Sequence, residues 1–167
     1  MTSATQVPRE DPARELLRHI VATLAYRAGK TVRDAPPSFA GYQASETTRT
    51  PAQILAHMGD LVDWALSIAS GRQQWRDSKP LPWPQEVSRF FAALSSLDAY
   101  LASENPLHGD IGKLFQGGLA DALTHTGQIA MLRRMAGCPV RGENYYQAHI
   151  EKGRVGPDQA APVREFD

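Results

Sequence analysis

Apolar side chains recur three and four positions apart in four separate stretches of this 167-residue chain. The clearest stripe includes one histidine and has spacings of 3, 4, 3 and 4 through Ile54, His57, Leu61, Trp64 and Ile68. Such spacing places side chains along one face of an α-helix, and no stretch alternates as a half-buried strand does. The pattern predicts an all-α protein built as a four-helix bundle.

Capping residues and prolines mark where the predicted helices begin and end. Asp11-Pro12 is typical of a helix start, and Thr50-Pro51-Ala52-Gln53 matches a capping box. Gly71 and Gly137 are typical of helix ends. The predicted helices run from Ala13 to about Arg33, from Pro51 to Gly71, from about Gln85 to Asn105, and from about Asp110 to Ala136.

The two ends of the chain lack this periodicity. Residues 1–10 are polar, and we expect them to be disordered or frayed. Residues 11–137 form the predicted bundle, and residues 138–167 form a C-terminal extension packed on it. We expect the extension to hold at most one short helical turn, near residues 144–151. The side chains expected to anchor it are Tyr145, Tyr146, Ile150 and Phe166.

Charge and composition exclude several classes of protein. Basic and acidic residues number 18 each, which argues against binding nucleic acid through phosphate neutralisation. The near-zero net charge does little to keep copies apart, so we expect a homodimer. No apolar run approaches the roughly 18 residues of a membrane span, and no signal peptide is present, which predicts a cytoplasmic protein. The single cysteine, Cys138, excludes an intramolecular disulfide and a multi-cysteine zinc site.

Three residues on two predicted helices could form a metal site. Asp121 and His125 are four residues apart, so they share one face of the last helix, and His57 lies in the stripe of an earlier helix. Two imidazoles and a carboxylate suit zinc, nickel, manganese or ferrous iron and leave positions open for water or substrate. Alternatively, Asp121 and His125 form a hydrogen-bonded pair within the helix, and His57 is an unrelated core residue. His19 and His108 are predicted to face solvent.

Three further residues could act at this site. Asp60, one turn after His57, could bind the ion, orient a ring nitrogen or move a proton. Gln128, close to one turn after His125, could hydrogen-bond at the site. Asp60 and Gln128 are therefore the candidate catalytic residues. If the extension folded back over the site, His149 could supply a third imidazole.

Two segments resemble the DinB-like (DinB/YfiT) superfamily. Residues 123–129, Leu-Thr-His-Thr-Gly-Gln-Ile, followed by Leu132-Arg133-Arg134, resemble its last-helix signature, and residues 54–60 resemble its first ligand helix. The resemblance covers about residues 10–137, and residues 142–145 look like the tail of one subgroup. It implies a four-helix bundle of up-down-down-up type, often dimeric, in which three histidines bind a divalent metal ion.

Carried over by position, the resemblance makes His57 the first ligand and His125 the last. Asp121 stands where the middle histidine is expected, and its charge would reduce the Lewis acidity of the ion. Characterised relatives are thiol-dependent transferases and isomerases that use mycothiol or bacillithiol. We therefore expect a metal-dependent hydrolase or thiol-dependent transferase that activates water or a low-molecular-weight thiol for attack on a small electrophile.

A rival hypothesis needs no metal. In it the chain is a non-catalytic homodimeric bundle that binds a partner, and its internal polar residues are hydrogen-bonded pairs. The tryptophans Trp64, Trp75 and Trp83 would then act as packing or interface anchors.

Overall fold

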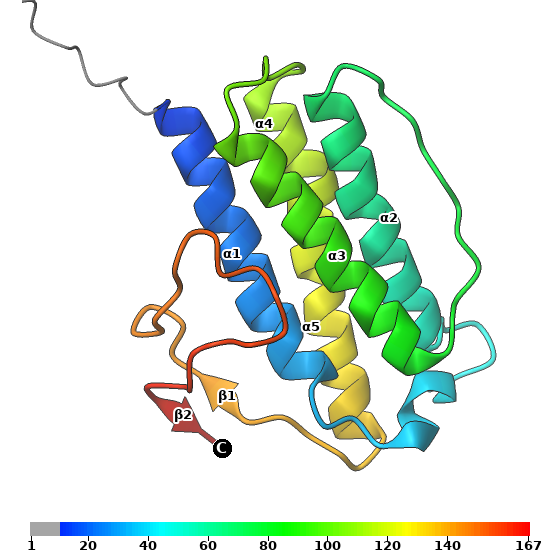
Figure 1. Ribbon diagram of the computed structural model, residues 1–167. Coiled ribbons are helices and arrows are strands. Elements are labelled where there is room, and N and C mark those ends of the chain that lie inside the picture. Colours follow the sequence, from blue (N-terminus) through cyan, green and yellow to red (C-terminus); the bar gives the residue numbers. More distant parts are fainter. Residues whose placement is uncertain (1–10) are drawn as a thin grey trace, which may run out of the picture.

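Four long helices pack side by side in the computed structural model, which describes residues 11–167 (Figure 1). The all-α prediction is confirmed. The segment expected to be frayed, residues 1–10, lies outside the described residues. The helices are α1 (Pro12–Val32), α2 (Pro51–Ala69), α3 (Trp83–Ala102) and a last helix that runs without a break through α4 (Ile111–Leu114), the π-helical segment η2 (Phe115–Leu119) and α5 (Ala120–Met135). A short 3-10 helix, η1 (Pro37–Gly41), lies between α1 and α2.

The predicted caps begin the first two helices. The Asp11 side chain accepts a hydrogen bond from the Ala13 amide at 3.0 Å. Thr50 and Gln53 form both halves of the capping box that begins α2. Helix α3 begins at Trp83, two residues before its predicted start. A proline in the first turn is compatible with a helix, because the amides there have no partner within the helix.

Helices α2 and α3 run parallel to each other, opposite to α1 and the last helix (Figure 1). Helix α1 packs against α3 and α5, and α2 packs against the same two helices. A parallel pair requires a connection as long as the helix itself, about 28 Å for the 19 residues of α2. The nearly extended segment 70–82 can span about 40 Å and returns along the bundle. This is the topology that the resemblance implies.

The core lies between the four helices and is built from their apolar faces. Fully buried side chains come from every long helix, among them Leu24, Leu55, Phe90, Leu94 and Ile129. Among residues 11–167, no helix has the length and apolar content needed to cross a membrane. As the buried residues show, the four helices pack their apolar stripes against one another.

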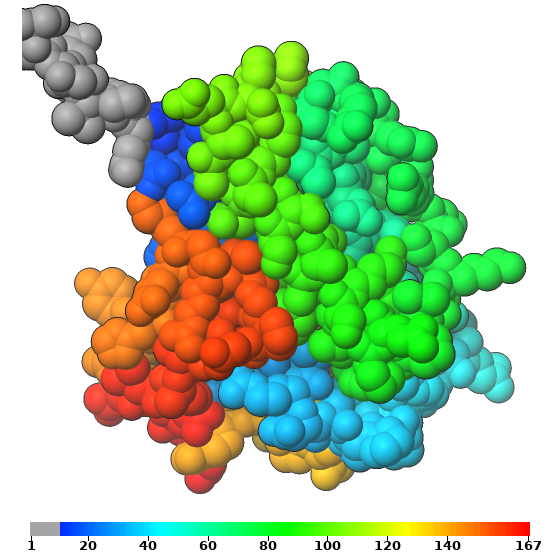
Figure 2. All heavy atoms as spheres, in the orientation of Figure 1, coloured from blue at the N-terminus to red at the C-terminus, as the bar shows by residue number. Residues whose placement is uncertain are grey.

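The C-terminal extension crosses the outside of α1, and its orange and red atoms cover the middle of that helix in Figure 2. It forms two short antiparallel strands, β1 (Gly142–Glu143) and β2 (Glu165–Phe166). Where at most one short helical turn was expected, the amides of Gln147 and Ala148 donate to the carbonyls of Asn144 and Tyr145 and form a turn. The prediction that Tyr146 and Phe166 anchor the extension is wrong, because their side chains are 98% and 54% exposed. Tyr145 does pack edge-on against the Tyr26 ring of α1, with the ring centroids 6.3 Å apart.

A buried polar cluster holds the extension on α1. The Glu143 carboxylate accepts hydrogen bonds from the Tyr26 hydroxyl at 2.6 Å and from Lys30 Nζ at 2.8 Å. Lys30 also donates to Glu165 at 2.7 Å, so one ammonium contacts both strands. Burial raises the pKa of Tyr26, and the hydrogen bond to Glu143 raises it further. A buried charged pair therefore holds the extension together with the expected anchors Tyr145 and Ile150, the latter packed against the core.

We expect Lys30→Met to lower the free energy of unfolding by about 3 kcal/mol or more, because it leaves the Glu143 carboxylate buried without its cation. Urea denaturation measures the change. Lys113→Met is the control, since Lys113 is exposed on α4. Equal, small losses in both variants would contradict the anchoring role of Lys30.

Candidate metal centre

Helices α2 and α5 bring His57, Asp121 and His125 together, as the sequence predicts. Asp121 lies between the two imidazoles: its Oδ2 is 3.9 Å from His57 Nε2, and its Oδ1 is 3.5 Å from His125 Nε2. The two imidazole centroids are 4.9 Å apart, and the rings are nearly perpendicular. One ligand atom from each residue lies within 4.8 Å of the other two. These three residues form the metal cluster.

The metal cluster fits a divalent ion. Metal bonds of about 2.0–2.2 Å place ligand atoms up to about 4.4 Å apart, so small rotations of the side chains close the remaining difference. The side chains of His125, His57 and Asp121 are 13%, 22% and 46% exposed, so an ion can reach the ligand atoms from solvent. Within residues 11–167, this is the one group of three or more such ligands.

Gln128 orients His125. The Nδ1 atom of His125 lies 2.7 Å from Gln128 Oε1, a carbonyl oxygen that can only accept. In this contact His125 Nδ1 is the donor, and Nε2 is the ring nitrogen directed at Asp121. Outer hydrogen bonds of this kind fix the tautomer of metal-binding histidines. The predicted contact of Gln128 with the site is present, and its catalytic role stays a prediction.

His57 is held against a pair of tryptophans. Its ring packs edge-on against Trp75 with centroids 5.7 Å apart, and Trp75 packs in the same way on Trp64 at 6.0 Å. Burial lowers the pKa of His57, and the charges of His125 and Arg49 lower it further, with partial compensation from nearby carboxylates. A lowered pKa keeps the imidazole neutral at pH 7, which is the form that binds metal.

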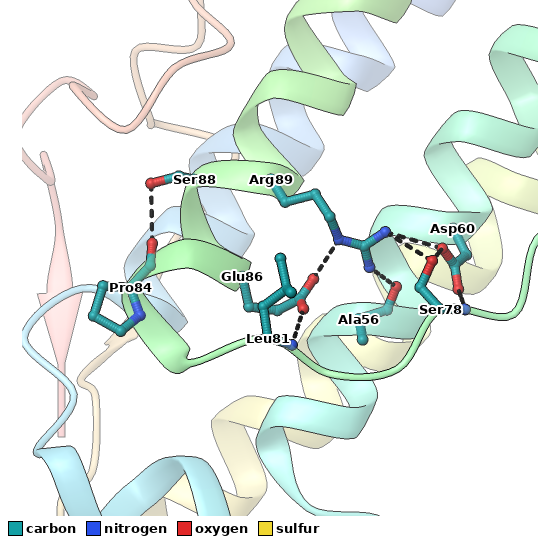
Figure 3. A network of polar contacts seen from close by, with 8 residues as sticks. All are labelled: Ala56, Asp60, Ser78, Leu81, Pro84, Glu86, Ser88 and Arg89. Carbon is teal, nitrogen blue, oxygen red and sulfur yellow. Dashed lines mark hydrogen bonds and ion pairs between the residues drawn. The ribbon is translucent and has the colours of Figure 1, made fainter.

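The Asp60 carboxylate lines the same cavity as His57, but its oxygens are engaged by other groups. It accepts hydrogen bonds from the amide and the hydroxyl of Ser78 at 2.8 and 2.7 Å, and from Arg89 Nη1 at 3.0 Å (Figure 3). Asp60 is 2% exposed and is not part of the metal cluster. These contacts support a structural role for Asp60, and Asp60 is not one of the three clustered ligands. Its predicted catalytic role stays a prediction, since Asp60 and His57 line one cavity.

Arg89 extends this network across α3 and the connection. Its Nε donates to Glu86 at 2.7 Å, and its Nη2 donates to the carbonyl of Ala56 at 2.7 Å. Glu86 also accepts from the amide of Leu81 at 2.8 Å. Figure 3 shows the guanidinium between Glu86 and Asp60. The network therefore fixes segment 70–82 at two points, and that segment carries Trp75 to His57.

The π-helical segment sets the approach of α5 to α2 just before Asp121. A Cβ atom on Gly118 would lie 2.7 Å from the Leu61 carbonyl oxygen, and one on Gly117 would lie 3.2 Å from the Trp64 ring. Position 118 therefore requires glycine, because the group it would meet is backbone. A π turn also shifts the phase of the helix that follows, and such turns are frequent at functional sites. This π turn was not predicted from the sequence. The pair Gly117-Gly118 inside a helical pattern is the sequence signal that could have indicated it.

Three cavities surround the metal cluster, and each contains one of its residues. His125 lines a cavity of about 460 Å³, His57 one of about 340 Å³, and Asp121 one of about 280 Å³. Arg49 lines the first two cavities. The cluster is therefore accessible to small molecules from more than one side.

The other histidines lie elsewhere. His149 is exposed on the extension and is not part of the metal cluster, so Asp121 and not His149 is its third member. His19 and His108 are exposed, as predicted.

No known protein family, curated protein or solved structure matches this chain. The likeness to the DinB-like superfamily therefore rests on the short segments around His57 and His125. The geometry of the metal cluster is independent of that likeness, and it carries the functional argument.

We expect Asp60→Asn to lower the free energy of unfolding by about 1.5–3 kcal/mol, because the hydrogen bonds of Arg89 and Ser78 lose their charged acceptor. Released segment 70–82 should also be cut faster by trypsin at Arg72 and Arg76. Asp77→Asn, on the same segment but exposed, is the control. Unchanged cleavage in Asp60→Asn would show that the network does not hold the connection.

We expect Gln128→Leu to weaken zinc binding by about 10–100-fold, because His125 loses the acceptor that fixes its tautomer. A competition titration with a chromophoric chelator measures the affinity. Gln85→Leu on α3, a helix that contributes no ligand, should bind zinc as the parent protein does. Equal affinities in all three proteins would contradict the orienting role of Gln128.

Proposed function

We propose that this protein is a divalent-metal-dependent enzyme of the DinB-like type that activates water or a small thiol for attack on a small electrophile. The observation that carries the proposal is the convergence of His57, Asp121 and His125 in a cluster open to solvent. A hydrogen-bonded pair on α5 would explain Asp121 and His125. It would not explain why His57 of another helix meets them.

The residues present suit such chemistry. When bound, a divalent ion lowers the pKa of a coordinated water or thiol, which supplies a nucleophile near neutral pH. His57 and His125 would hold the ion as neutral imidazoles, and Asp121 would add one negative charge. The exposed carboxylate of Asp121 has a second oxygen that can accept the proton of the attacking group. Trp75 packs edge-on against one side of His57.

Two observations support the DinB-like type. The helix directions are those that the resemblance implies, with α2 and α3 parallel (Figure 1). The first and last implied ligands, His57 and His125, meet in space. Asp121 departs from the pattern of three histidines, so the ion would keep less positive charge. We expect this site to favour ions that accept a mixed nitrogen and oxygen ligand set, such as zinc, manganese, nickel or ferrous iron.

Elemental analysis of protein purified without added metal tests the proposal. We expect about one divalent ion per chain, since the three ligands surround one position. The double variant His57→Ala/His125→Ala should lose it. His19→Ala/His149→Ala, which removes two exposed histidines, should retain it. An ion lost equally from both double variants would point to adventitious binding.

Two results together would favour the rival homodimeric binding module. The purified protein would contain no ion, and His57→Ala/His125→Ala would be as stable as the parent protein. The oligomeric state measured on the same samples by light scattering then becomes the relevant property.

A further inference from the structure

Arg49 is a cation placed between the two larger cavities at the metal cluster. It precedes the cap Thr50 of α2, is exposed, and lines the cavity beside His125 as well as the cavity beside His57. Its guanidinium makes no hydrogen bond or ion pair with any residue in 11–167, although its charge is close enough to lower the pKa of His57. By contrast, the donors of Arg89 are engaged by Glu86, Asp60 and the carbonyl of Ala56.

The cavity beside His125 has two chemically different walls. Ile54, Met131 and Leu132 supply apolar surface, and Arg49, Thr48 and the His125–Gln128 pair supply polar groups. Its volume of about 460 Å³ lies in the range typical of pockets for small organic molecules. None of the residues that line it is acidic, whereas the second cavity that Arg49 lines contains Asp60 and Asp77.

An arginine with free donors beside an apolar wall selects a particular ligand. The planar guanidinium binds carboxylates and phosphates through two parallel hydrogen bonds, and such bonds are stronger where water is partly excluded. Burial of an apolar group against Met131 and Leu132 adds affinity without a directional requirement. A ligand that satisfies both walls has an anionic group at one end and an apolar body at the other.

We propose that the cavity beside His125 binds a small organic anion, with its charged group on Arg49 and its apolar body against Ile54, Met131 and Leu132. The proposal rests on the proposed function, because it names the substrate class of the same site: a small, partly apolar organic acid whose reactive carbon lies next to the metal cluster. Arg49 is then a specificity-determining residue.

Three probe molecules distinguish the contributions of the polar wall and the apolar wall to binding. Phenylacetate carries the charge and the apolar body, phenylacetamide carries the body without the charge, and acetate carries the charge without the ring. Their dissociation constants are measured by NMR titration on the metal-free full-length protein, so that the ion does not contribute. We expect phenylacetate to bind more tightly than either of the other two.

Variants then test the arginine. Arg49→Met should weaken phenylacetate binding by about ten-fold or more, which is the loss expected for a charge-assisted pair. The affinity for phenylacetamide should stay unchanged. Arg49→Lys should retain part of the affinity, because the charge remains and the fork geometry is lost. Arg134→Met is the matched control: Arg134 is exposed on α5, nine residues and about two and a half turns from His125, hence on the opposite face.

Phenylacetamide that binds as tightly as phenylacetate, or phenylacetate binding that is equal in Arg49→Met and Arg134→Met, would overturn the proposal. These results are independent of the metal. Charge-selective binding in a protein that never acquires an ion would support the anion site and contradict the proposed metal enzyme. Stoichiometric metal without charge-selective binding would overturn the anion site and leave the metal enzyme standing.

Discussion

The Arg89 guanidinium is shared by two buried carboxylates, and the arrangement of the bundle around the site depends on it. Asp60 on α2 and Glu86 on α3 are both buried, so each requires a cation within hydrogen-bonding distance. One arginine serves both, and this fixes the two parallel helices relative to each other. The same carboxylates bind Ser78 and Leu81 of the connection. The path of the connection, and with it the tryptophan beside His57, follows from this charge pairing.

The helices could be predicted because their signals are local. The stripe through Ile54 and Leu61 and the capping box at Thr50 depend on residues three or four positions apart, and both appear in the structure as expected. The directions of the helices have no such signal, because an amphipathic stripe shows which face is buried and not which neighbour covers it. The two strands were missed because each contains two residues, too few for an alternating pattern.

The candidate site was predicted in part for the same reason. The spacing of Asp121 and His125 is one helical turn, and a histidine inside an apolar stripe points inward, so the convergence with His57 could be inferred. Asp60 was ambiguous: its position one turn after His57 fits the site face and equally the face toward α3, and its partner Arg89 is 29 residues away. Arg49 lies in a loop, where no periodicity indicates which way a side chain points.

The attachment of the extension has a consequence for how the molecule opens. Lys30 and Glu143 are separated by 113 positions, but the packing of α1 on α5 already closes that loop, so their pairing fixes only the extension. The extension contacts α1 from outside, and within residues 138–167 only Val155 belongs to the buried core cluster. It can therefore detach as one unit while the bundle stays folded. Amide protons of its two strands should accordingly exchange with solvent through a sub-global opening, well ahead of those in the central turns of α2 and α5.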